Sequence, residues 1–66
     1  MPLISTAALL FLNADSTNSS LNRIILGTGG DLQIYHDGSN SYISDTGTGS
    51  LKFTSSDIIM QTTGGN

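Results

Sequence analysis

Catalytic chemistry in this chain would have to begin at His36 and Asp37, its only histidine and the carboxylate that follows it. A serine nucleophile needs a histidine that takes its proton and an aspartate on the other ring nitrogen, all held in a pocket. Adjacent residues of a turn point apart, and a chain of 66 residues has no second layer of side chains to fix their rotamers. We therefore interpret this pair as turn residues and expect no enzymatic activity and no cofactor.

Metal and phosphate sites have little support. The chain has no cysteine, and its single histidine cannot form the His-x-His pattern of an axial ion site. We expect no metal, and in a symmetric assembly His36 and Asp37 are only weak candidates for one. The segment 27–30 (GTGG) lacks the lysine of a phosphate loop. All five aspartates lie at or near predicted turns, where an aspartate side chain can accept hydrogen bonds from nearby backbone N–H groups. They are Asp15, Asp31, Asp37, Asp45 and Asp57.

Tyr35 and Tyr42 flank the predicted turn and belong to the polar face of the hairpin. Exposed aromatic rings on a sheet can stack on a sugar or a partner surface. The favoured interpretation is a cross-strand pair that stabilises the hairpin by about 0.2–1 kcal/mol. The candidates for surface recognition are Tyr35, His36 and Tyr42.

These residues need strands to position them, and the sequence pattern predicts short ones. Leu32 and Ile34 alternate with Gln33 and Tyr35, which is typical of a half-buried strand. Residues 36–40 (HDGSN) then supply the turn chemistry of Asp, Gly and Asn. Further strands are predicted at residues 21–26 (with Arg23 exposed), 41–44, 51–54 and 58–61. Residues 7–12 suit a strand or a short helix, and we favour a strand.

Composition excludes several classes of protein. The net charge is −3 with only two basic residues, which argues against nucleic-acid binding, because that affinity comes largely from neutralised phosphates. The longest apolar run, residues 7–12, falls well short of the roughly 20 residues that cross a bilayer. No Lys or Arg precedes Arg23, so a secretory signal lacks its positive region. We expect neither nucleic acid nor a membrane span.

The short strands leave a thin core and open edges. Open edges pair with other chains unless charges or prolines block them, and the predicted strands carry one Lys, one Arg and no Pro. We therefore expect an all-β fold whose short strands and polar turns form an assembly between copies. The core shared between copies is predicted to comprise Leu32, Ile34, Ile43, Leu51, Phe53, Ile58 and Met60.

Residues 30–43 (GDLQIYHDGSNSYI) resemble a segment that recurs in tail fibres and tail-associated proteins of marine phages, especially cyanophages. Residues 44–53 and 22–29 continue this similarity, which covers about half of the chain. The resemblance implies a homotrimer with an intertwined β-helical or β-prism shaft, located in the virion or outside the cell. It also implies a shaft or connector role in host adsorption.

Two departures keep alternatives open. Fibres with this segment run to hundreds of residues, whereas this chain has 66. Residues 1–20 also do not resemble a virion-anchoring domain. We therefore also consider a small self-assembling subunit of an extracellular β-filament, because head-to-tail addition without closure gives a filament. A third alternative is a module that binds host-surface glycan through the Tyr/His/Asp turn. We divide the chain into an N-terminal assembly segment, residues 1–20, and a β-rich fibre-like module, residues 21–66.

Overall fold

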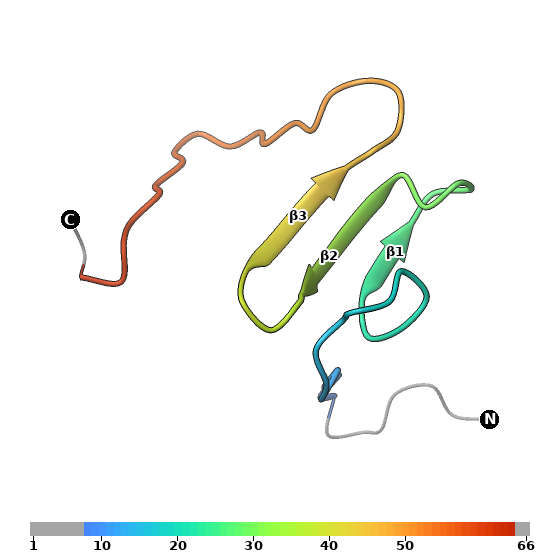
Figure 1. Ribbon diagram of the computed structural model, residues 1–66. Helices are drawn as coiled ribbons and strands as arrows, with labels where there is room; N and C mark the ends of the chain where they lie inside the picture. The colour runs from blue at the N-terminus through green and yellow to red at the C-terminus, as the bar shows by residue number, and fades with distance from the viewer. Residues whose placement is uncertain (1–7, 65–66) are drawn as a thin grey trace.

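The fold is a three-stranded antiparallel sheet in a computed structural model that describes residues 8–64 (Figure 1). Its strands are β1 (Ile24–Leu26), β2 (Leu32–His36) and β3 (Ser41–Asp45), and β2 lies between the other two. Residues 8–64 contain no helix, and therefore none that is long and apolar enough to cross a membrane. The expectation of an all-β fold is confirmed for this part of the chain.

The strand register gives the sheet two chemically different faces. Ile24 is paired with Ile34, which is paired with Ile43, so one isoleucine from each strand forms a row across the sheet. Tyr35 is paired with Tyr42 on the opposite face, because successive side chains of a strand alternate. We call the first face the isoleucine row and the second the tyrosine face. The alternation in the sequence predicted this separation.

The β2–β3 hairpin is closed by a four-residue loop, as the turn residues predict. The Asp37 carboxylate accepts hydrogen bonds from the backbone N–H groups of Ser39 (2.9 Å) and Asn40 (2.8 Å). Gly38 has a φ of 102°, in the left-handed region that glycine enters without strain. Local side-chain bonds and one glycine thus fix this turn.

The N-terminal part of the sheet is reached through a tight bend. Asn22 has a φ of 59°, a left-handed conformation that asparagine tolerates better than most residues. The backbone N–H of Ser16 donates a 2.7 Å hydrogen bond to the His36 carbonyl and so ties the N-terminal segment to the end of β2. Because of this bend, β1 begins at Ile24 and the predicted strand over residues 21–26 is too long.

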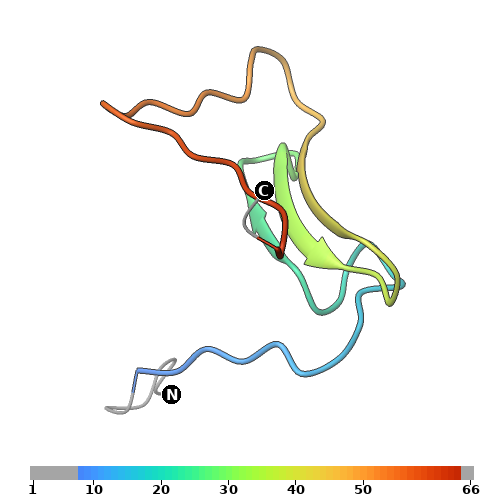
Figure 2. The same ribbon diagram turned by 90° about the vertical axis from the view of Figure 1, so that its left-hand side faces the viewer.

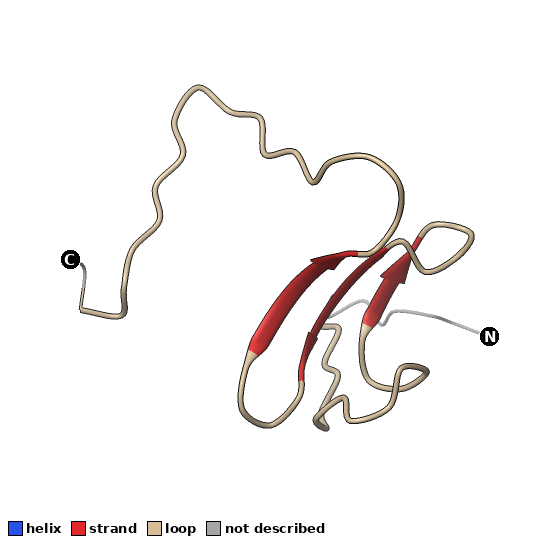
Figure 3. Ribbon diagram, turned by 45° about the horizontal axis from the view of Figure 1, so that its top comes forward, coloured by secondary structure: helices blue, strands red, loops and turns tan. Residues whose placement is uncertain are grey.

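Two predicted strands, at residues 51–54 and 58–61, are wrong for the single chain. Residues 48–64 lie outside the sheet, and every one of them is exposed (Figures 1 and 3). We call residues 48–61 the arm. Its alternating sequence is compatible with a strand, but a strand requires a hydrogen-bonded neighbour, and the sheet pairs only β1, β2 and β3.

The predicted strand at the N-terminus is also absent where it can be assessed. Residue 7 lies outside the described residues, and residues 8–12 form neither strand nor helix. Figure 2 shows this N-terminal segment and the arm extending from opposite ends of the sheet.

No hydrophobic side chain is buried in the part of the chain that the structure describes. Leu32 is half-buried, and the other six predicted core residues are exposed, from 37% at Ile34 to 80% at Met60. The only buried residue among residues 8–64 is Ser16, which is 1% exposed. A core shared between copies stays a prediction, because a single chain does not bury these side chains.

The Asp31 side chain lies between two glycine turns, which gives a first test of the fold. A methyl group added at Gly47 would lie 2.8 Å from Asp31 Cβ, whereas one added at Gly29 would meet Asp31 no closer than 3.4 Å. We expect Gly47→Ala to destabilise the sheet by about 1–3 kcal/mol through overpacking, and Gly29→Ala to have a smaller effect. Hydrogen exchange of the β2 and β3 amides measures this difference, and equal protection in both variants would contradict the packing described.

Candidate functional site

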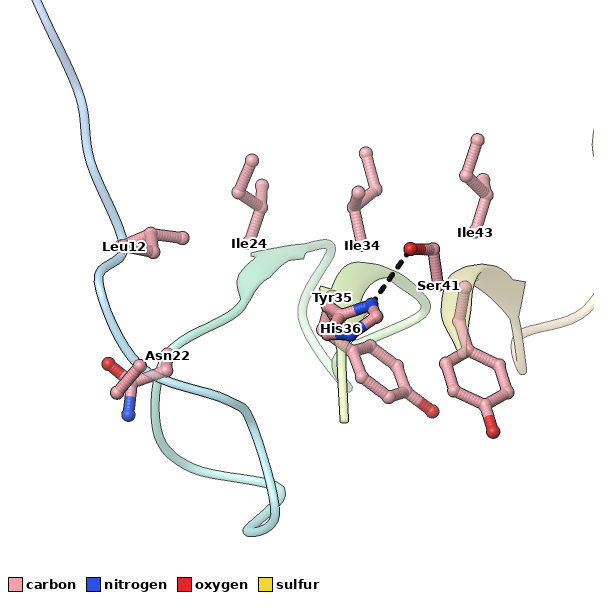
Figure 4. Close-up of a pocket in the computed structure, with 10 residues that line it drawn as sticks. Leu12, Asn22, Ile24, Ile34, Tyr35, His36, Ser41 and Ile43 are labelled. Atoms are coloured by element: carbon pink, nitrogen blue, oxygen red, sulfur yellow. Dashed lines mark hydrogen bonds between the residues drawn. The ribbon is translucent and has the colours of Figure 1, made fainter. Parts of the chain in front are cut away.

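The turn residues singled out by the sequence do come together, but not as a catalytic triad. His36 Nδ1 lies 2.9 Å from Ser41 Oγ across the hairpin end, and both residues are exposed (Figure 4). The Asp37 carboxylate is directed into the loop, towards Ser39, Asn40 and Tyr42. Within residues 8–64, no hydrogen bond joins this carboxylate to His36. The pair therefore lacks the aspartate that would orient and charge-stabilise a catalytic imidazole.

Asp37 instead acts as the cap of the loop. Its Oδ1 accepts the two backbone N–H groups, and its Oδ2 accepts the Tyr42 hydroxyl at 3.0 Å. The backbone hydrogen bonds from Asn40 and Ser39, and then the bond from Tyr42, lower the pKa of the Asp37 carboxyl. Hydrogen bonds to the charged form favour ionisation, so the loop is most stable with Asp37 deprotonated.

The tyrosine face is organised around stacked rings. The rings of Tyr35 and Tyr42 have centroids 4.7 Å apart and planes inclined by 19°. The Arg23 guanidinium lies 3.7 Å from the centroid of the Tyr35 ring. Because β2 lies between β1 and β3, Arg23 and Tyr42 cover opposite sides of Tyr35. The cross-strand tyrosine pair expected from the sequence is confirmed, and a sugar would have to stack on the outer side of Tyr42.

Arg23 links the tyrosine face to the N-terminal bend. Its Nε donates to Ser16 Oγ and one terminal nitrogen donates to Gln33 Oε1, both at 2.7 Å. The Ser16 hydroxyl donates in turn to the Leu21 carbonyl at 2.6 Å. The expectation of an exposed Arg23 is wrong, because these partners hold it half-buried. Sequence reasoning missed this cluster, although Arg23 is the chain's single arginine and lies within the strand predicted at residues 21–26.

The opposite face carries an open apolar groove of about 670 Å³. Figure 4 shows Ile24, Ile34 and Ile43 projecting side by side, with Leu12 of the N-terminal segment beside Ile24. His36 and Ser41 border the groove where β2 ends and β3 begins. The groove has one polar border and an apolar floor, which suits an apolar side chain better than a charged ligand.

Metal ligands do not gather in the described part of the chain. No group of three or more His, Asp or Glu side chains there could hold an ion. The weak candidates His36 and Asp37 are engaged with Ser41 and with the loop, respectively.

Replacing Arg23 by lysine tests the central role of the guanidinium. A lysine keeps the charge but cannot bond Ser16 and Gln33 while stacking on Tyr35. We expect Arg23→Lys to lower the opening free energy of the sheet by about 1–2 kcal/mol, the scale of lost charge-assisted bonds. Hydrogen exchange of β2 amides reports the loss, and Lys52→Arg, an exchange of the same two residue types outside the sheet, is the matched control. Unchanged protection in Arg23→Lys would show that the cluster does not support the sheet.

Acid should loosen the loop at Asp37. Its pKa is lowered in the folded chain, so the stabilisation it gives is fully present above the ordinary aspartate pKa and is lost as the pH falls through the folded-state pKa. We expect the amide signals of Ser39 and Asn40 to titrate below the range of an unstructured aspartate in NMR spectra. Asp37→Asn should abolish this titration, and Asp57→Asn should leave it. Titration of both amides in the ordinary aspartate range would contradict the capping geometry.

Comparison with known proteins found no relative of this chain. No family model matches the chain, and neither the curated proteins nor the solved structures gave a match. The function is therefore argued from the two faces of the sheet.

Proposed function

We propose that this chain is a structural module that assembles with copies of itself into a β-rich fibre. The closed form is an intertwined homotrimer, a tail-fibre-like shaft or connector that contributes to host adsorption in a virion. The module has no enzymatic activity, and its role is mechanical: pairing between chains gives stiffness, and the polar turns keep the outer surface hydrated.

The observation that carries this proposal is the absence of a buried hydrophobic side chain in residues 8–64. Burial of apolar surface is the dominant favourable term in folding. An ordered sheet that keeps its isoleucines exposed must gain that term elsewhere, and a second copy offers the same apolar row. The Cα radius of gyration, 14.7 Å, exceeds the roughly 11 Å expected of a compact domain of this length.

The sheet edges support the same proposal. β1 and β3 each pair on one side only, so the outer side of each strand presents backbone groups without a strand partner. β3 contains neither Lys nor Pro, the residues that most often block such edges. The segment that resembles phage fibres, residues 30–43, contains β2, the capped loop and the first residues of β3.

Two alternatives use the same surfaces differently. Head-to-tail addition through the two edges would build an extracellular filament in place of a closed trimer. Glycan recognition by Tyr35, His36 and Tyr42 would depend on the outer side of Tyr42, since Arg23 and Tyr42 cover the two sides of Tyr35. We favour the structural role because Ile24, Ile34 and Ile43 form an exposed apolar row along the open groove.

Sedimentation of the full chain tests the assembly. We expect assemblies of three or more copies of the 6.9 kDa chain, because contact with another copy buries the exposed isoleucine row. Ile34→Lys should shift the protein towards monomer, while Ser44→Lys, on the opposite face, should assemble as the wild type does. Electron microscopy separates short rods, expected of the trimer, from long fibrils, expected of the filament. A folded wild-type monomer at micromolar concentration would overturn the proposal.

A further inference from the structure

The surface of the chain is too large for a self-contained protein of its mass. The chain exposes 5813 Å², whereas a compact monomer of 6.9 kDa exposes about 4,000 Å². The difference, about 1,800 Å², is roughly twice the 800 Å² that each partner contributes to a stable interface. Each copy therefore has enough surplus surface for two neighbours.

Every residue of the arm contributes to this exposed surface. Leu51 and Phe53 alternate with Lys52 and Thr54, whereas residues 58–60 (IIM) form a continuous apolar run. All are exposed, and the arm runs away from the sheet of its own chain (Figures 1 and 3). An extended segment that carries an alternating stretch and a short continuous apolar stretch is suited to join the edge of an existing sheet.

Of the two edge strands, β3 is better placed than β1 to accept an added strand. On the β1 side, Leu12 of the chain's own N-terminal segment already borders the groove (Figure 4). On the β3 side the isoleucine row ends at Ile43, which is 53% exposed. A strand added there would place its alternate apolar side chains beside Ile43 and would pair the outer backbone groups of β3.

We propose that the arm of a second copy adds to β3 as a fourth strand and extends the isoleucine row. This inference rests on the proposed self-assembly and names one contact within it, at the edge of β3; the cover of the isoleucine row is a separate contact between copies. Each copy then donates its arm and accepts another, which accounts for two interfaces per chain. The same exchange closes into a ring or continues as a filament, depending on the rotation between copies.

Photo-crosslinking of the unaltered sequence tests the contact. Met60 is the only methionine apart from Met1, so photo-methionine places a nearly isosteric probe in the arm. Cleavage after Arg23 and Lys52, the two basic residues, separates the fragments 1–23, 24–52 and 53–66. Isotopically heavy and light chains are mixed, assembled, irradiated and digested. We expect crosslinks between a heavy fragment 53–66 and a light fragment 24–52, attached within Ser41–Asp45.

Matched proline variants test the strand pairing itself. Ile59→Pro removes a backbone donor inside the apolar run of the arm and should lower the mixed crosslink several-fold. Ser56→Pro lies between the two apolar stretches of the arm and should retain the mixed crosslink. Protection of β3 amides from hydrogen exchange should rise on assembly of the wild type and of Ser56→Pro.

The outcomes separate this inference from the proposed function. Crosslinks within one copy, between two arms or onto β1, in a protein that sediments as an assembly, would overturn arm exchange and leave self-assembly standing. A wild-type monomer would overturn both. Unchanged mixed crosslinking in Ile59→Pro would contradict the added strand even if the arm touches a neighbour.

Discussion

The sheet depends on the contacts that the Arg23 guanidinium makes on the tyrosine face. The guanidinium stacks on Tyr35 while donating to Ser16 and Gln33, and Tyr35 stacks in turn on Tyr42. The residue before β1, the strands β2 and β3 and the N-terminal bend are thereby connected on one face without a buried apolar side chain in residues 8–64. Charge-assisted hydrogen bonds and stacking take the place that aliphatic packing holds in most small domains.

Satisfying one face in this way leaves the other face for a partner. The tyrosine face is closed by contacts within the chain, whereas the isoleucine row has a groove in front of it. Contact between aliphatic surfaces is not directional, so neighbours of many shapes can cover the isoleucine row. The backbone hydrogen bonds of a strand edge are directional, and they fix the orientation and register that apolar contact alone does not. The proposed fibre combines these two requirements, because stiffness needs register and cohesion needs burial.

The sequence was most informative where structure depends on neighbouring residues. The hairpin of β2 and β3 and the Tyr35–Tyr42 pair followed from alternation and from the turn residues 36–40, whose bonds are local. The strands predicted at 51–54 and 58–61 failed because a strand needs a neighbour that this chain does not provide. The Arg23 cluster and the His36–Ser41 contact depend on register and side-chain direction, which composition and period do not report.

Asp31 has a consequence for how this sequence can change over time. Its side chain occupies the space in front of Gly27, Gly29 and Gly47, which belong to two turns separated by a strand pair. An alanine at Gly47, whose Cβ would lie 2.8 Å from Asp31 Cβ, becomes tolerable only if position 31 becomes smaller, so Gly47 and Asp31 form one unit of covariation. Drift at the ends of the hairpin is therefore concerted, even though the residues involved are exposed or only partly covered.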